Sequence, residues 1–311
     1  MTSVPDCGDS RLPLTILGGF LGSGKTTLLE RTYLDPHAAI IVNDTGDRSP
    51  DLVAGVHALL GGCACCDRLD ALVGLLRKLC EDRHLGTGPH RVVLETSGLA
   101  DPARILEAVE HDPILVSNVV IGDVVITVDA ERGVSDLVHE PLARAQVEQA
   151  DTVVVTKADL AGPEALGVAL ATVASVNPGA RFQVTAFGEA RTVPPIDPDS
   201  AVELPATTTL EPPRSGWIPV PGTVDWTVLS LWLGALTVAY PQQILRVKGL
   251  LQTARGALIL HAARGTVGVP TRLAGRVDEG ELGLLFVTRG LDPDMVARSW
   301  DAHRRALSAD L

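Results

Sequence analysis

The sequence predicts an α/β protein in which a doubly wound, mostly parallel sheet is followed by a smaller α+β domain. Over the first 190 residues, short apolar runs alternate with stretches of helical periodicity, as in a parallel sheet covered by helices. A glycine-rich turn joins the first apolar run to the first helical stretch. Eight prolines then fall within residues 191–222, and a different pattern follows. We therefore expect a domain over residues 1–190, an extended linker over 191–222 and a second domain over 223–311.

Each element of the first domain has its own pattern. Strands are expected where Val, Ile and Leu form short runs, and helices where apolar residues recur at spacings of three and four. The N-terminal residues 1–11 are polar and are expected to be disordered. The expected strands are Leu12–Gly18, Ala38–Val42, Val56–Leu60, Arg91–Glu95, Val119–Val128, Asp151–Thr156 and Arg181–Thr185. The expected helices are Lys25–Tyr33, Asp67–Leu79, Leu137–Val147 and Glu164–Val176.

The second domain carries fewer but equally regular patterns. Apolar residues from Trp226 to Leu236 recur at helical spacing. The runs Ile244–Leu251 and Ala257–His261 read as paired strands, and Leu284–Thr288 as another strand. Pro293 is well placed as the first residue of a closing helix that reaches Leu307. These elements predict a small α+β domain.

Composition and charge narrow the functional classes. The net charge of −12 argues against a nucleic-acid partner. No apolar run is long enough to cross a bilayer, and the N-terminus lacks the apolar region of a signal peptide, so we expect a cytoplasmic protein with no membrane partner. Three of the five cysteines crowd into four positions, which in a reducing compartment indicates metal binding or reactivity rather than disulfides.

The glycine-rich turn fits the G-x4-G-K-[ST] pattern of a phosphate-binding loop, with Gly19, Gly24, Lys25 and Thr26 at the defining positions. Glycines let the backbone curl so that several N–H groups point at one phosphate chain, and the helix N-terminus adds its positive dipole end. The lysine can reach the β- and γ-phosphates, and the threonine hydroxyl can ligate Mg²⁺. The predicted nucleotide contacts in this stretch are Gly19, Gly22, Ser23, Gly24, Lys25, Thr26 and Thr27.

A second motif, Glu95-Thr96-Ser97-Gly98, ends a buried-type strand. An acidic residue at a strand tip beside the phosphate loop can hold Mg²⁺ directly or through water. The Gly98 N–H can approach the γ-phosphate closely because no side chain intervenes. We therefore predict Lys25, Thr26 and Glu95 as the catalytic residues; the alternative for the tetrapeptide is a plain strand-end turn.

A third motif, Thr156-Lys157-Ala158-Asp159, follows a late strand. A carboxylate here can accept two hydrogen bonds from the N1–H and N2–H₂ edge of guanine, and adenine offers no such pair of donors. The lysine stem can cover the flat base. The motif predicts GTP over ATP, with Thr156, Lys157 and Asp159 in contact with the nucleotide. The alternative is a charged loop after a core strand.

The cysteine cluster is Cys63, Cys65 and Cys66. Soft thiolates select Zn²⁺ or Cu⁺, and Co²⁺ is a further option. A closed structural zinc site needs four protein ligands, so this incomplete set suits transient holding and transfer. Asp47, His57, water or a client protein could supply the missing ligand. The alternative is that these cysteines are small buried residues with no ligand.

The chain resembles the CobW-like family of metal-linked P-loop GTPases (CobW-HypB-UreG type). The resemblance rests on Gly18–Thr27, Gly62–Cys66, Val93–Pro102, Val155–Asp159, Leu245–Gly249 and the Gly290-Leu291 turn. It implies a P-loop NTPase domain with a CobW C-terminal-like domain, and a GTPase that handles zinc or cobalt for client metalloproteins.

Two departures from the family pattern bear on metal handling. After the second strand the family usually reads Asn-Glu-Phe-Gly-Glu, whereas residues 43–47 read Asn-Asp-Thr-Gly-Asp. The shortened carboxylates reach less far toward a metal. Many relatives carry a histidine-rich linker, whereas residues 191–222 contain no histidine, which argues against bulk metal collection.

We therefore predict a GTP-hydrolysing metallochaperone or maturation factor that uses GTP, Mg²⁺ and Zn²⁺ or Co²⁺. The first alternative is an NTP-dependent assembly factor for a client enzyme without metal transfer. The second is a metal-binding module that holds nucleotide without useful turnover. The sequence leaves homodimerisation open.

Overall fold

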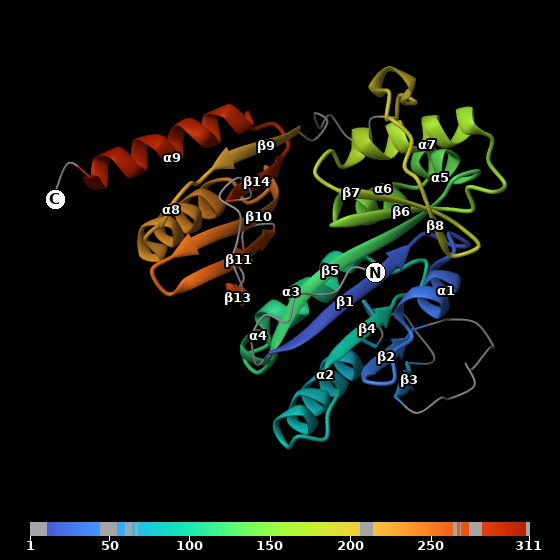
Figure 1. Cartoon of the computed structure of the whole chain (residues 1–311), viewed down its shortest axis with the longest axis horizontal. Helices are drawn as coiled ribbons and strands as arrows, with labels where there is room; N and C mark the ends of the chain where they lie inside the picture. The colour runs from blue at the N-terminus through green and yellow to red at the C-terminus, as the bar shows by residue number, and fades with distance from the viewer. Residues whose placement is uncertain are drawn as a thin grey trace. The chain divides into compact units, whose positions relative to one another are not determined.

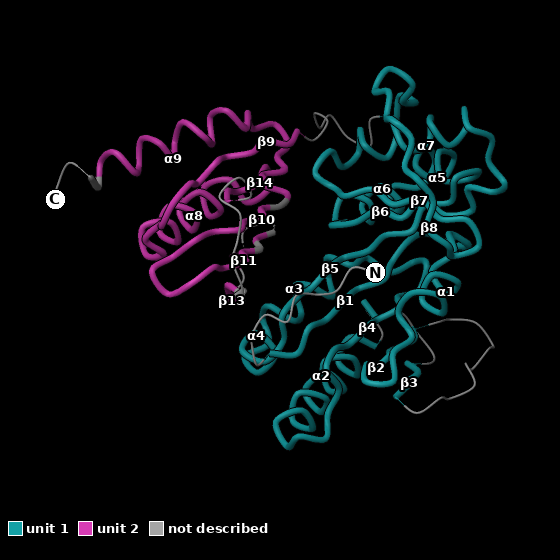
Figure 2. Tube along the Cα trace, viewed as in Figure 1, with its two compact units in different colours: residues 1, 10–207 teal, residues 2–9, 208–311 magenta. Residues whose placement is uncertain are grey.

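The computed structural model describes two compact units, one built mainly from Ser10–Thr207 and the other from Thr208–Leu311 (Figure 2). Residues Arg214–Pro219 form strand β9 inside the stretch expected to be a linker, and the domain boundaries stay a prediction. The expected disorder of residues 1–11 falls almost wholly outside the described residues. The described residues are 11–43, 55–59, 64–65, 68–205, 214–263, 266–267, 269–273 and 282–308.

An eight-stranded sheet forms the first unit, in the order β3-β2-β4-β1-β5-β6-β7-β8 (Figure 1). All neighbouring strands are parallel except β7 and β8. This arrangement is the doubly wound, mostly parallel sheet that the sequence predicts. The strands are β1 (Leu12–Gly19), β2 (Ala38–Val42), β3 (Val56–Ala58), β4 (Arg91–Glu95), β5 (Val119–Asp129), β6 (Thr152–Thr156), β7 (Arg181–Ala186) and β8 (Glu189–Arg191).

The central strands are apolar throughout because both faces of the sheet are covered. On β1, Leu14 and Ile16 belong to one large core cluster, whereas Leu17 belongs to a second cluster with Leu28 and Leu29 of the first helical segment. The helical segments are α1 (Lys25–Leu28), the π-helix η1 (Leu29–Tyr33), α2 (Leu69–His84), α3 (Pro102–His111), α4 (Leu115–Asn118), α5 (Gly133–His139), α6 (Pro141–Glu148), α7 (Pro163–Val176) and the 3₁₀ turn η2 (Pro198–Ser200).

The helices differ from the expected ones at several places. The expected helix Lys25–Tyr33 changes to π geometry after Leu28. The expected helix over 137–147 is two helices, because Pro141 has no N–H to continue the first and instead begins the second. Helix α3 was not expected, although Asp101 caps it by accepting from Ala103 N at 3.0 Å and Pro102 starts it.

The second unit is an antiparallel sheet in the order β12-β11-β10-β14-β9, with β13 paired to β11. Its core centres on Trp232, whose ring centroid lies 5.0 Å from that of Trp300 and 5.9 Å from that of Phe286. No described helix in either unit is long and apolar enough to cross a membrane. The elements are β9 (Arg214–Pro219), α8 (Trp226–Ala239), β10 (Ile244–Thr253), β11 (Gly256–Ala263), β12 (Thr266–Val267), β13 (Thr271–Leu273), β14 (Gly283–Thr288) and α9 (Pro293–Ser308).

Candidate nucleotide-binding site

The phosphate loop lies at the carboxyl end of β1, between the neighbouring strands β4 and β5. This is where open α/β sheets bind ligands, because the strand order reverses there. Gly19, Gly22 and Gly24 all have positive φ, and Gly24 is the N-cap of α1. The structure therefore places the predicted stretch from Gly19 to Thr27 as one turn that leads directly into a helix.

Hydroxyl groups from two other strands hold this loop in shape. Ser23 Oγ donates to the Phe20 carbonyl at 2.7 Å and lies 2.6 Å from Thr127 Oγ1 of β5. Thr156 Oγ1, at the end of β6, donates to the Ser23 carbonyl at 2.7 Å. Lys25 Nζ donates to the carbonyls of Gly19 and Phe20 at 3.0 and 3.1 Å, so its ammonium group lies within the curve of the loop.

The threonine of the phosphate loop, Thr26, contacts the acidic residue at the end of β4, Glu95. Thr26 Oγ1 donates to Glu95 Oε1 at 2.6 Å, and Glu95 is only 4% exposed at the end of β4. A hydroxyl and a carboxylate side by side are the hard oxygen donors that Mg²⁺ prefers, with the remaining positions left to water and phosphate. This donor set fits Mg²⁺, and the predicted pair comes together from residues far apart in the sequence.

The turn after β4 lies against the phosphate loop. A Cβ on Gly98 would come within 2.9 Å of the backbone of Leu21, so only glycine allows this approach. The fully buried Gln146 of α6 holds the same turn, because its Nε2 donates to the carbonyls of Gly98 and Ala100 at 3.1 and 2.8 Å. The turn that is predicted to meet a γ-phosphate is thus fixed on two sides.

A cleft of ≈ 240 Å³ adjoins the loop at the ends of β6 and β7. Residues from the start of α1 and residues of the predicted guanine motif line it together. Six of its lining residues are Gly24, Thr27, Thr156, Lys157, Asp159 and Phe187.

A buried carboxylate positions the lysine of this cleft. Lys157 Nζ lies 2.6 Å from Oδ2 of Asp129, whose side chain is 4% exposed at the end of β5. Burial alone would raise the pKa of Asp129, but the hydrogen bonds from Lys157 and from the backbone N–H groups of Glu131 and Arg132 outweigh it and lower that pKa. Asp129 therefore stays ionised and holds the lysine in place.

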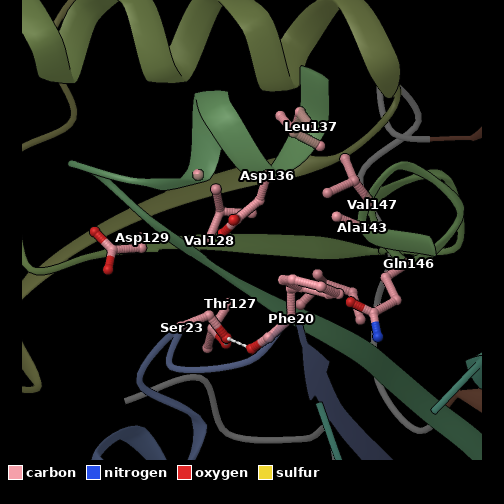
Figure 3. A pocket seen from close by; sticks show the side chains of 12 residues that line it. Phe20, Ser23, Thr127, Val128, Asp129, Asp136, Leu137, Ala143, Gln146 and Val147 are labelled. Atoms are coloured by element: carbon pink, nitrogen blue, oxygen red, sulfur yellow. Dashed lines mark hydrogen bonds between the residues drawn. The ribbon is translucent and has the colours of Figure 1, made fainter. Parts of the chain in front are cut away.

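A second, much smaller cavity lies behind the loop (Figure 3). Phe20, Ser23 and Gln146 line it, and its volume is only ≈ 10 Å³. That is about the room needed by a single water molecule. The larger cleft is therefore the candidate nucleotide site, and this cavity belongs to the packing between the loop and α6.

One residue links the cysteine segment to the strand end that carries Glu95. Asn43 is 1% exposed; its backbone N–H donates to the Glu95 carbonyl at 2.9 Å, and its Oδ1 accepts from Ala64 N at 2.7 Å. Next to Ala64, Cys65 is 6% exposed and lies in the core cluster. Within the part of the chain that the structure describes, no three His, Cys, Asp or Glu side chains are grouped to hold a metal. The other predicted metal ligands, Cys63, Cys66 and Asp47, lie outside the described residues.

Two family models match the chain. Residues 13–184 match the nucleotide-binding domain of CobW/HypB/UreG, and residues 215–304 match the C-terminal domain of the cobalamin synthesis protein cobW. The chain belongs to the CobW family. The resemblance seen in the sequence motifs is thereby confirmed for both halves of the chain.

Curated relatives and solved structures agree with this assignment. The zinc chaperone YjiA of Escherichia coli is 32% identical over 49% of this chain and 51% of its own. The zinc-regulated GTPase metalloprotein activator 1 of Schizosaccharomyces pombe is 33% identical over 57% of this chain and 46% of its own. This CobW chain thus spans about half the length of the curated relatives that it matches. A crystal structure of Zn(II)-bound YjiA GTPase from E. coli, with 21% identity, 94% of this chain and 98% of that chain covered and a TM-score of 0.59, shows the same fold.

Sequence reasoning missed three residues of the candidate site. Gln146 and Asp129 act on the site from α6 and β5, and no motif marks either of them. Phe187 comes from the turn between β7 and β8. An available indication for Asp129 was its place at the carboxyl end of an apolar run beside the phosphate loop, which is where parallel sheets collect polar side chains.

Proposed function

We propose that this CobW-family protein binds GTP with Mg²⁺ and hydrolyses it to GDP and phosphate. One observation carries the proposal: the phosphate loop and the guanine motif line a single cleft, and the Thr156 hydroxyl ties them together through the Ser23 carbonyl. The loop supplies backbone N–H groups for the phosphates, and Asp159 supplies the acceptor that distinguishes guanine from adenine. Nucleotide binding assays with GTP and ATP test it directly.

The roles of the remaining residues follow from their positions. Lys25 lies within the curve of the loop, where its charge meets the β- and γ-phosphates. Thr26 and Glu95 would hold Mg²⁺, and bound Mg²⁺ supplies neutralisation of the charge that develops on the phosphates. Gly98 brings a backbone N–H toward the γ-phosphate, and Gln146 keeps that turn in place.

We further propose that hydrolysis serves the delivery of zinc to a client metalloprotein in the cytoplasm. Curated relatives are named zinc chaperones and zinc-regulated GTPases, and the Cys63, Cys65 and Cys66 thiols would bind the metal. Cobalt is the second metal that this ligand chemistry allows. The bonds of Asn43 to Glu95 and Ala64 support a link between the nucleotide and the thiols.

A second candidate is an assembly factor that uses nucleotide without metal transfer. The burial of Cys65 in the hydrophobic core favours it, because structural cysteines are among the most buried residues. In this candidate the cysteines stabilise the fold, and GTP controls the docking of a client.

Zinc and cobalt titrations of the apo, GDP-bound and GTP-analogue-bound protein separate the two candidates. Under the chaperone proposal, metal affinity changes with the nucleotide by about 5–150-fold, and the metal changes GTP affinity by the same factor. A variant with Cys63, Cys65 and Cys66 all changed to serine should lose the metal and keep GTP binding. Equal metal affinity in all three nucleotide states would leave the assembly-factor candidate.

A further inference from the structure

Two residues of the nucleotide cleft have an unusual backbone. Among the described residues, Lys157 (φ 56°) and Phe187 (φ 53°) are the only non-glycine residues with positive φ, and both line the cleft. Positive φ is costly for a bulky side chain, because its Cβ crowds the backbone. Such outliers persist where the surrounding structure holds them, and they gather at ligand sites.

Phe187 occupies a type of turn that favours other residues at its position. Strands β7 and β8 pair antiparallel, with Ala186 opposite Glu189, so that Phe187 and Gly188 are the two central residues of the hairpin. Both have positive φ, at 53° and 78°, as a type I′ turn requires. Asn-Gly or Asp-Gly is the favoured pair in that turn, and phenylalanine is not.

Burial does not compensate for this strain. Phe187 is 69% exposed, and it is absent from the hydrophobic clusters that the described residues form. The turn lies close to the first helical segment: a Cβ on Gly188 would lie 2.6 Å from Arg31 Cγ and 3.5 Å from the Thr27 carbonyl oxygen. The hairpin therefore packs against the helix that follows the phosphate loop, and its aromatic side chain lines the cleft while staying mostly exposed.

We propose that Phe187 stacks on the base of the bound purine nucleotide and forms a clamp with Lys157. The lysine is the second wall, because Asp129 holds its ammonium at 2.6 Å and leaves its stem along the cleft. Stacking on an aromatic ring is tolerant of base identity, so the clamp gives affinity and Asp159 gives the preference for guanine. This inference rests on the proposed nucleotide binding.

Substitution of Phe187 by Asn separates stacking from a structural role, because Asn accepts positive φ. GDP affinity of F187N should fall by about 5–150-fold, the range expected for the loss of one base–aromatic stack. Affinity for tripolyphosphate, which has no base, should stay unchanged. The apo protein should melt higher by about 2–4 °C, because the strain is relieved. F187Y and F187W should keep the affinity of the wild type, and the emission of F187W should change when GDP binds.

Leu85→Asn is the matched control, since Leu85 is also strongly exposed, at 72%, but has a negative φ of −79° and lies outside the cleft. It should neither raise the melting temperature nor change GDP affinity. Wild-type GDP affinity in F187N would overturn the stacking, and a lowered apo melting temperature would overturn the strain argument. If the wild type bound ATP as tightly as GTP, the guanine preference would fail, while a loss of ATP affinity in F187N would still support the clamp. A wild type that binds neither nucleotide would overturn both proposals.

Discussion

Thr156 belongs to the predicted guanine motif, and its hydroxyl group helps to fix the shape of the phosphate loop. It donates to the Ser23 carbonyl at 2.7 Å, and the residue is 5% exposed. Its side chain also packs on the loop, because a Cβ on Gly24 would lie 3.3–3.5 Å from Thr156 atoms. Thr156→Val keeps this shape and removes only the donor.

The expected magnitude follows from that geometry. A neutral hydrogen bond contributes about 0.5–1.5 kcal/mol, and a buried carbonyl left without its donor costs about 1–3 kcal/mol. We expect Thr156→Val to lower the free energy of unfolding by about 1–2 kcal/mol. If the loop is released in the free protein, binding must supply the same free energy to order it again. GDP affinity then falls by about 5–30-fold.

Calorimetric GDP titration and thermal unfolding measure the two effects separately. Thr152→Val is a matched control at the opposite end of β6, where the hydroxyl donates to Asp123 Oδ2 at 3.0 Å. That variant should lose similar stability and keep its GDP affinity. Thr156→Ser should retain both properties. If Thr156→Val bound GDP like the wild type, its hydroxyl would serve the fold alone, and the coupling argued here would be wrong.

Three further predictions test other parts of the site. Asp159→Ala should weaken GTP binding by about 1–3 kcal/mol and leave ATP binding unchanged, because the guanine donors go unpaired. Competition binding with both nucleotides measures this. Lys25→Ala should abolish phosphate release with an unchanged melting temperature, and undiminished turnover would remove the loop from the mechanism. Because the pKa of Asp129 is lowered in the folded state, its contribution to stability is present above about pH 4 and is lost as the pH falls through that lowered pKa. Acid unfolding of Asp129→Asn should therefore lack this part of the pH dependence.

Local patterns were sufficient for most of the fold. The parallel strands of the first unit coincide with apolar runs, because a strand that is buried on both faces is apolar throughout. The phosphate loop is visible in the sequence because its chemistry requires fixed residue types at fixed spacing. Strand β9 was missed because Arg214–Pro219 is short, carries a proline and lies among other prolines.

Gln146 and Asp129, which hold other parts of the candidate site in place, could not be predicted from the sequence, for a physical reason. Gln146 and Asp129 act only through contacts with segments that are remote in the sequence, and nothing next to them marks those contacts. Phe187 is different, because it contradicts a local rule: its turn favours asparagine. Conflicts between local preference and structure are expected at functional sites. The strand pattern alone did not reveal this conflict, since the turn type becomes evident only once β8 is seen to pair with β7.

Asn43 gives the clearest physical basis for the proposed link between nucleotide and metal. Its backbone N–H is bonded to the Glu95 carbonyl, and its side chain is bonded to Leu59 O at 3.0 Å and Ala64 N at 2.7 Å. A displacement of Glu95 on binding Mg²⁺ and GTP would therefore shift the residue next to Cys65. Interiors are close-packed, so such a shift passes on as a discrete rearrangement rather than being absorbed. The asparagine is also the part of the Asn-Asp-Thr-Gly-Asp turn that matches the usual family pattern. Its three bonds join the end of β4, which carries Glu95, to Leu59 and Ala64 without using an acidic side chain.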